Sequence, residues 1–134
     1  MSMQGLQKLE ACKRAKNFAL RIYHDVLALL PLKEKWNLSS QLRRSCVSIS
    51  ANIAEGYVRV YYQENNRFCY TARGFLEETL SHLAFSFEAN YLPDILFKEL
   101  STEGDEIGRM LNGYITYLKR SKQGANEVGS VRAI

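Results

Sequence analysis

Long apolar runs and secretion signals are missing from this chain of 134 residues. No stretch of eighteen or more apolar residues occurs, and the first residues are not a charged segment followed by an apolar block. We therefore expect neither a membrane span nor a secretory signal, and we expect the cytoplasm as the location. The length fits one domain whose core needs neither metals nor disulfides.

Cysteine is also scarce, since the chain contains only Cys12, Cys46 and Cys69. An odd number of widely spaced cysteines argues against a disulfide framework and against a zinc site. All three fall within helical patterns, where a free cysteine is usually a small buried residue. We expect them in or near the core.

Residues for catalysis are few. The only histidines are His24 and His82, and neither stands in a nucleophile-and-base motif. A di-iron bundle needs Glu-x-x-His pairs on two helices, but Glu78 and His82 are four residues apart and no second pair exists. Ser45, Ser48 and Ser50 lie in one predicted helix, where serine usually bonds to the carbonyl one turn earlier. The sequence predicts a protein that is not an enzyme and that holds no metal or other cofactor.

The charge is unevenly distributed along the chain, although the net charge is only +4. Residues 1–59 contain ten basic residues against four acidic ones, whereas residues 60–104 contain three basic residues against seven acidic ones. Five basic and three acidic residues follow. This asymmetry predicts a basic side that attracts polyanions and an acidic side.

Apolar residues recur at helical spacing in four segments, about 5–30, 38–55, 65–89 and 94–119. Ile22, Val26 and Leu29 are expected in the inward stripe of the first segment, and Ile95 in that of the last. Short joins contain Pro31, Gly56 and Pro93, and Asn37, Ser39 or Ser40 could cap the second helix. Residues 57–62 alternate like a strand but have no partner, so we interpret them as a turn and the entry to the third helix. Residues 101–104 are a predicted weak point of the last helix. Four long helices with short joins predict an antiparallel up-and-down four-helix bundle over residues 1–120, followed by a flexible basic tail over 121–134.

The second helix is the most informative segment. Leu38, Leu42, Cys46 (or Ser45), Ile49 and Ile53 form an apolar seam at spacings of three and four. Arg43 and Arg44 lie beside that seam, and Asn52 and Glu55 share one flank of the helix. Gly56 is expected to end the helix in a left-handed conformation.

Residues 41–56 read Q-L-R-R-S-C-V-S-I-S-A-N-I-A-E-G. This run resembles the signature Q-x-R-R-A-x-x-S-I-x-x-N-I-A-E-G of the 23S rRNA intervening-sequence proteins, a family of four-helix bundles. Residues 72–78 are similar to the family's A-x-G-S-L-x-E segment, and the resemblance covers about 9–118. Three departures are Ser45 in place of alanine, Trp36-Asn37 in place of an aromatic-glycine pair, and Phe75 in place of serine.

The resemblance implies an assembly and a partner. Similar proteins form ring-like homopentamers with a positively charged surface, so we expect this chain to assemble with copies of itself. Five copies would multiply a modest basic patch into a high-avidity surface for RNA or DNA. The residues expected to contact phosphate are Lys13, Lys16, Arg43, Arg44, Arg59, Lys119 and Arg120.

Two further sets of residues are singled out. The tyrosines near the third helix could stack on unpaired bases, although tyrosines at such spacings also serve core edges; they are Tyr57, Tyr61, Tyr62 and Tyr70. A structural polar cluster is expected from Asn52, Glu55, Arg73 and Glu78, with Asn52 bonded across the bundle. In the alternative interpretation, Asn52 and Glu55 touch RNA or a partner chain. One of the paired arginines is expected to bond an acidic residue of the third helix.

The favoured hypothesis is a non-enzymatic, oligomeric RNA-binding accessory protein. The resemblance also implies a second setting, an accessory subunit that binds a reverse transcriptase and its RNA in a diversity-generating retroelement. A structural adaptor whose ligand is protein remains as an alternative.

Overall fold

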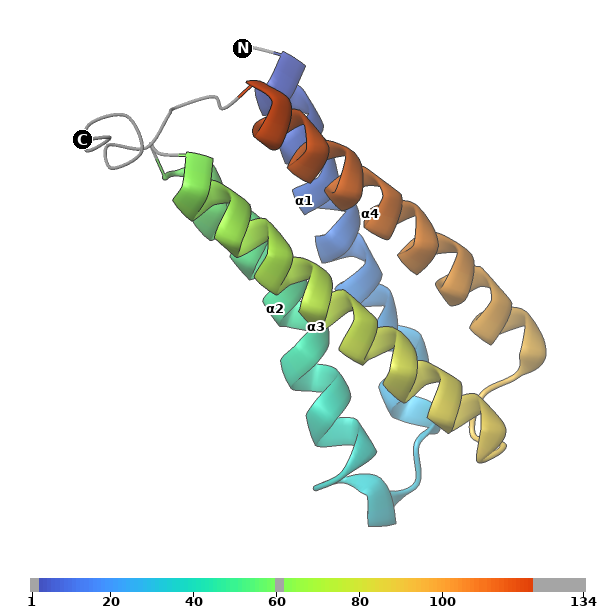
Figure 1. The fold of residues 1–134 in the computed structure, drawn as a ribbon. Coiled ribbons are helices and arrows are strands. Elements are labelled where there is room, and N and C mark those ends of the chain that lie inside the picture. The colour runs from blue at the N-terminus through green and yellow to red at the C-terminus, as the bar shows by residue number, and fades with distance from the viewer. Residues whose placement is uncertain (1–2, 60–61, 122–134) are drawn as a thin grey trace.

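The structure is a computed structural model that describes residues 3–59 and 62–121. Four helices account for most of these residues: α1 (Met3–Arg21), α2 (Leu38–Tyr57), α3 (Tyr62–Glu88) and α4 (Asp94–Ser121). The helices alternate in direction; each packs against its predecessor, and α4 returns to pack against α1 (Figure 1). The predicted all-α, antiparallel up-and-down bundle is confirmed. Of the predicted tail, residues 122–134 lie outside the described residues.

The first helix ends differently from the prediction. After Arg21 the chain forms a π-helical segment, Ile22–Val26, and then a 3-10 turn, Leu27–Leu29. A π turn takes more residues than an α turn, so the apolar stripe shifts along the sequence. Ile22 and Val26 are buried as predicted, but Leu29 is 46% exposed and Leu30 takes the inward position. The prediction that Leu29 faces inward was wrong for this reason.

The link to α2 is short and makes contact with the loop between α3 and α4. Pro31 is extended, a 3-10 turn follows at Leu32–Glu34, and the Tyr91 hydroxyl donates a hydrogen bond of 2.9 Å to the Glu34 carboxylate. Asn37 occupies the N-cap position of α2, yet its side chain makes no capping bond. The backbone alone begins this helix, with the Gln41 amide donating to the Asn37 carbonyl at 2.9 Å.

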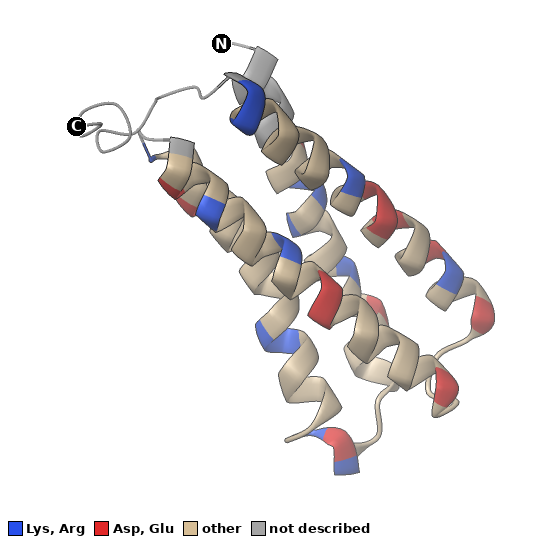
Figure 2. Cartoon of the chain, in the orientation of Figure 1, with Lys and Arg blue, Asp and Glu red and all other residues tan. Residues whose placement is uncertain are grey.

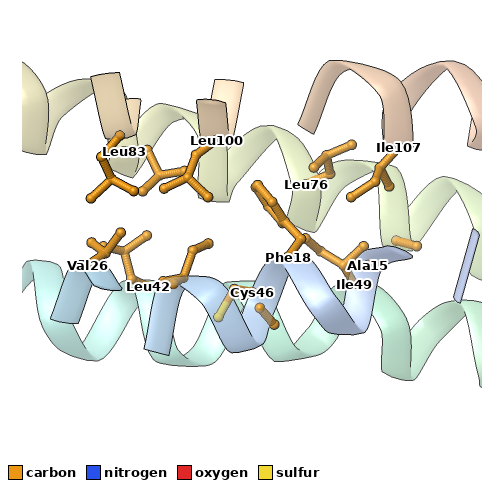
Figure 3. Packing of buried hydrophobic residues seen from close by; sticks show 14 of the residues in the cluster. Ala15, Phe18, Val26, Leu42, Cys46, Ile49, Leu76, Leu83, Leu100 and Ile107 are labelled. Carbon is orange, nitrogen blue, oxygen red and sulfur yellow. The ribbon is translucent and has the colours of Figure 1, made fainter. Parts of the chain in front are cut away.

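The core forms where the apolar stripes of the four helices meet, as Figure 3 shows for part of it. Every residue of the predicted α2 seam is buried, which confirms that interpretation. Ala15 and Phe18 come from α1, and Leu76 and Leu83 come from α3. Helix α4 supplies a row at spacings of four and seven: Leu96, Leu100, Ile107 and Leu111. Ile95 falls outside this row and is 70% exposed, contrary to the prediction for it.

The α2–α3 join does not use glycine as expected. Helix α2 continues to Tyr57, so Gly56 lies buried within its last turn instead of ending it. Val58 follows with an ordinary right-handed backbone, and the Arg59 amide donates to the Gly56 carbonyl at 3.1 Å. Residues 60–61 lie outside the described residues, and α3 begins at Tyr62, earlier than predicted.

Asn90 makes the turn between α3 and α4. It has φ of 67°, a left-handed conformation that asparagine tolerates better than most residues. The Asn90 amide donates to the Phe87 carbonyl and the Tyr91 amide to the Ser86 carbonyl, both at 2.9 Å. This pair of bonds is the Schellman motif that ends many helices.

Helix α4 is continuous from Asp94 to Ser121, so the predicted weak point at 101–104 is not a break. Gly104 is instead buried against α3. A Cβ atom at this position would lie 2.5 Å from Cδ2 of Leu80. The glycine therefore allows α3 and α4 to approach closely at this level.

Candidate nucleic-acid interface

One outer face of α3 alternates between cationic and aromatic side chains near the start of the helix. Arg67, Tyr70 and Arg73 follow one another at spacings of three, which places them on the same side of the helix. The antiparallel course of α4 brings its last turn, with Lys119, beside this face. Residues almost fifty positions apart therefore form one surface.

Aromatic rings hold these cations in place. The guanidinium carbon of Arg73 lies 4.7 Å from the centre of the Tyr70 ring, and the ammonium nitrogen of Lys119 lies 5.3 Å from the same centre. The neighbouring ring of Phe68 has Arg59 at 5.0 Å and Arg67 at 5.7 Å. Each distance is within the range of a cation–π attraction. Four positive side chains are thus gathered around two rings.

A groove of about 540 Å³ opens between α3 and α4 at this point. Its lining has donors and no carboxylate: Gln63, Asn66, Arg67, Tyr70, Thr71 and Lys119. Of these, Asn66 is unusual, because its side-chain oxygen is buried without a hydrogen-bond partner. We call this feature the α3–α4 groove.

The groove is supported from below by a small second core. Cys69, Tyr114, Ile115 and Leu118 are buried together there, with Tyr117 packed against them. The buried Asn65 amide donates to the Tyr114 hydroxyl at 3.0 Å, joining α3 to α4. Closer to the middle of the bundle, Arg73 donates to the Asn112 side-chain oxygen at 2.7 Å. These contacts fix the spacing of the two helices that form the groove.

The fold gathers charges of opposite sign at opposite ends of the α3–α4 pair, which we call the basic end and the acidic end. Residues 65–76 and 107–120, which lie side by side, contain five basic residues and no acidic ones. Residues 77–106, at the opposite end of the same helices, contain eight acidic residues and one basic one. Figure 2 shows Lys and Arg on the upper part of α3 and α4, and most Asp and Glu below them.

Ion pairs neutralise much of the acidic end. Arg14 donates to Glu103 at 2.9 Å and to Glu106 at 2.5 Å, and Arg21 donates to Glu99 at 2.5 Å. The hydrogen bonds with these carboxylates raise the pKa of both arginines. Two cations of α1, Arg14 and Arg21, are therefore paired with carboxylates of α4 and are not available to an external anion.

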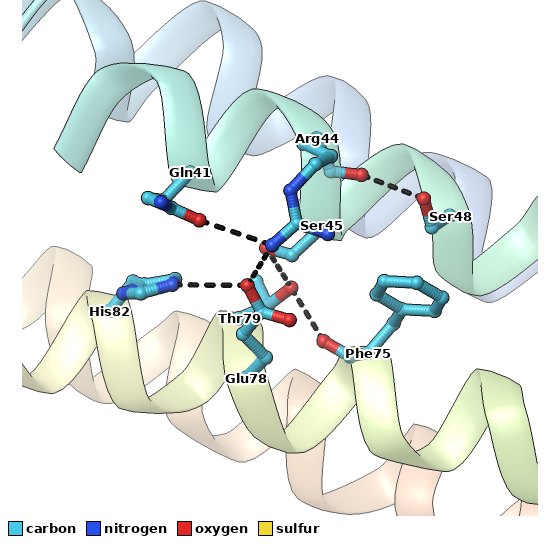
Figure 4. Close-up of polar contacts among 8 residues, drawn as sticks. All are labelled: Gln41, Arg44, Ser45, Ser48, Phe75, Glu78, Thr79 and His82. Atoms are coloured by element: carbon cyan, nitrogen blue, oxygen red, sulfur yellow. Dashed lines mark hydrogen bonds and ion pairs between the residues drawn. The ribbon is translucent and has the colours of Figure 1, made fainter. Parts of the chain in front are cut away.

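Arg44 is similarly engaged, and Figure 4 shows its surroundings. Its guanidinium forms an ion pair with Glu78 of α3 and donates to the Gln41 side-chain oxygen at 3.0 Å. The expectation that one of the paired arginines bonds an acidic residue of the third helix is confirmed. Arg43, one position earlier, forms no ion pair with any carboxylate of the described residues.

The remaining predicted phosphate contacts are divided among several surfaces. Lys13 and Lys16 are exposed on α1, and Lys16 borders a depression between α1 and α2. Arg59 pairs with Glu55 at 2.5 Å. Lys119 and Arg120 lie at the end of α4, the former in the groove. Only Lys119 and Arg120 belong to the basic end, with Arg59 next to it over the Phe68 ring, so within a single chain the seven predicted residues do not form one site.

The expected polar cluster is dispersed. Asn52 donates to the Ser48 carbonyl of its own helix at 2.8 Å and not across the bundle, which corrects that expectation. Glu55 is bound by Arg59. Arg73 joins Asn112, while Glu78 joins Arg44. The four residues thus enter separate contacts, because they lie at different levels and on different faces of α2 and α3.

Groups suited to catalysis stay apart. His82 lies 3.3 Å from Glu78, a carboxylate that Arg44 already binds. His24 is exposed on the π-helical segment. Within residues 3–59 and 62–121, no three histidine, cysteine or acidic residues come close enough to hold a metal ion. None of the helices in this part of the chain is long and apolar enough to cross a membrane.

Sequence reasoning missed two residues of the interface. Arg67 was not considered, and Arg73 was assigned to the polar cluster instead of the basic surface. The spacing of three that relates Arg67, Tyr70 and Arg73 is a signal that could have found them. Of the tyrosines proposed for stacking, Tyr70 lines the groove and Tyr57 is exposed at the end of α2. Tyr61 and the Tyr62 side chain lie outside the described residues.

Comparison with known proteins identifies a family. A family model described as 23S rRNA-intervening sequence protein matches residues 7–113, which include most of the bundle. No curated protein matches the chain. The matched range ends before the last turn of α4 and so does not contain Lys119.

Proposed function

The chain belongs to the 23S rRNA-intervening sequence protein family, and we propose that it is a non-enzymatic RNA-binding accessory protein. Its contact surface is the basic end of the bundle, formed by the first half of α3 and the last turns of α4. The resemblance found in residues 41–56 and 72–78 points to the same family. The surface itself comes from residues that the family signature does not contain.

A single observation carries this proposal: five cations and no carboxylate on adjoining stretches of two helices. Three of them, Arg67, Arg73 and Lys119, lie against aromatic rings and are therefore held together before any ligand arrives. Cations that neutralise phosphates release condensed counterions, which supplies most of the affinity for a nucleic acid. Because Arg67, Arg73 and Lys119 form no ion pair with a carboxylate of the described residues, these three side chains suit a polyanion.

The test is a salt titration of RNA binding. Arg67→Gln combined with Lys119→Gln removes two charges from the basic end and should weaken binding at all salt concentrations. The slope of log affinity against log salt should become less steep by about one for each lost phosphate contact. Lys33→Gln with Lys35→Gln is the matched control, since both lysines are exposed at the far end of the bundle.

Two results would contradict the proposal. One is an RNA affinity of the unchanged protein that does not fall between low and physiological salt. The other is an equal effect of the two double variants, which would mean that the basic end has no special part. If RNA does not bind at all, a structural adaptor for protein becomes the better hypothesis.

We also propose that the protein acts as a ring-like homopentamer, as the resemblance implies. Three apolar side chains support self-association, each about 40–46% exposed: Leu20 of α1, Tyr23 of the π-helical segment and Val47 of α2. They surround a depression of about 170 Å³ with almost no polar lining. Repeating the basic end five times would raise the avidity for one RNA molecule without any new contact.

A further inference from the structure

We propose that the α3–α4 groove binds one unpaired nucleotide of the RNA, with its base against Tyr70 and its phosphate on Arg67 and Lys119. This inference rests on the proposed function and adds a selection that charge alone does not give. A purely electrostatic surface binds single strands and duplexes alike. A groove with an aromatic ring, two cations and an unsatisfied acceptor favours a base that is free of its partner.

The Tyr70 ring is the stacking surface. It is 37% exposed, and in the free protein Arg73 and Lys119 rest near it. A cation–π contact at an exposed site is weak, whereas a hydrogen bond between a cation and a phosphate is strong. The base of a nucleotide can therefore stack on the Tyr70 ring, while its phosphate replaces the ring as the partner of a cation. Every base has a flat π-face, so this contact does not depend on sequence.

Asn66 supplies the second observation. Its side-chain oxygen is buried and lacks a partner, although buried acceptors in folded proteins are normally bonded. The oxygen is covered in the free protein, so a donor on a ligand reaches it only if the Asn66 side chain turns toward the groove. A ribonucleotide has such donors on its ribose hydroxyl and on its base.

The size of the groove agrees with one nucleotide. Its volume of about 540 Å³ leaves room for one nucleotide that lies on the surface, because the groove is shallow and open to solvent. In a duplex the faces of each base are covered by its neighbours, so Tyr70 could reach only a base that is splayed out. The expected ligand is therefore a loop, a bulge or a single-stranded end.

The experiment compares a fluorescent ten-nucleotide single strand with a duplex of the same length, using the full chain. Tyr70→Leu keeps every charge but removes the ring, and it should weaken single-strand binding by about tenfold, with duplex binding unchanged. Tyr70→Phe keeps the ring and should restore the affinity. Phe85→Leu is the control, because this aromatic ring is exposed on the acidic half of α3 and lies outside the groove.

A second measurement locates the base. An oligonucleotide with 5-iodouridine, cross-linked by ultraviolet light, should attach within residues 63–73, and Asn66→Ala should lower the preference for the single strand. The inference is overturned if Tyr70→Leu affects both ligands equally or neither, while salt-dependent binding persists. It is also overturned if cross-links fall elsewhere. If the unchanged protein shows no salt-dependent RNA binding, the proposed function is excluded, and this inference with it.

Discussion

Ser45 of α2 and Thr79 of α3 face each other inside the bundle, with their hydroxyl oxygens 2.8 Å apart and neither residue exposed (Figure 4). The Thr79 hydroxyl also lies 2.8 Å from the Phe75 carbonyl of its own helix. Alanine is usual at the position of Ser45 in the family signature. The hydroxyl is therefore accommodated here by a partner on the facing helix, and the two groups bond α2 to α3 within an otherwise apolar layer.

The first prediction concerns this pair. Ser45→Ala leaves Thr79 its bond to Phe75 and should cost about 1 kcal/mol or less, whereas Thr79→Val leaves the Ser45 hydroxyl without its α3 partner and should cost about 1–2 kcal/mol. The double variant should cost less than the sum, because both polar groups are gone. Urea denaturation of the four proteins measures the coupling. Strictly additive costs would show that the hydroxyls do not interact.

The second prediction compares two glycines of α4. Gly113→Ala meets no atom within 4 Å and should stabilise the helix by about 0.5–1 kcal/mol. Gly104→Ala gains the same helix propensity but places its Cβ against Leu80, so it should destabilise the protein. The midpoint of thermal unfolding separates the two. Equal stabilisation by both variants would mean that Leu80 moves aside without cost.

The helices could be predicted from the sequence wherever one period of 3.6 residues holds throughout. The α2 seam meets this condition, and all its residues are buried. Leu29 does not, because the π-helical segment before it shifts the phase by about one residue. A π-helical segment is defined by its backbone hydrogen bonds, and it has no pattern of apolar residues by which the sequence could reveal it.

The site could be predicted only in part. Lys119 and Arg120 were chosen for their charge, but their relation to Tyr70 depends on the antiparallel return of α4. Arg14 and Arg21 are as basic as Lys13 in sequence, yet they are paired with carboxylates almost ninety and eighty residues away. Which cations are free to bind a ligand is a property of packing, and local sequence does not contain it.

The third prediction concerns thiol reactivity. Burial raises the pKa of the Cys46 thiol to about 11, so at pH 8 only about one molecule in a thousand has a thiolate there. Cys12 is only partly buried. Alkylation of the native protein should therefore modify Cys12 first, with Cys46 and Cys69 reacting at the rate of unfolding. Peptide mass analysis over time follows the order, and early modification of Cys46 would contradict its burial.

The fourth prediction is a pH dependence of stability. The hydrogen bond from Arg14 lowers the pKa of the Glu106 carboxyl below its usual value of 4.5. A lowered pKa in the folded state means that the stabilisation is fully present above pH 4.5 and is lost as the pH falls through the lower folded value. Glu106→Gln should therefore reduce the melting temperature at pH 7 but not near pH 2. A difference that persists unchanged in acid would exclude this ion pair as its source.

The fifth prediction tests assembly. If copies associate through the apolar patch on α1 and α2, then Val47→Glu buries an unpaired charge in the interface and should yield single chains. Light scattering should show the mass fall from that of five 15.4 kDa chains to that of one, while circular dichroism shows the helices intact. Ile95→Glu is the control, because Ile95 is exposed on α4 away from the patch.

The same variant should also weaken RNA binding, since avidity depends on the number of basic ends in one particle. With Val47→Glu the RNA affinity should fall by about a hundredfold or more, although no phosphate contact is altered. An unchanged mass would place the interface elsewhere, and a monomeric starting protein would exclude the ring.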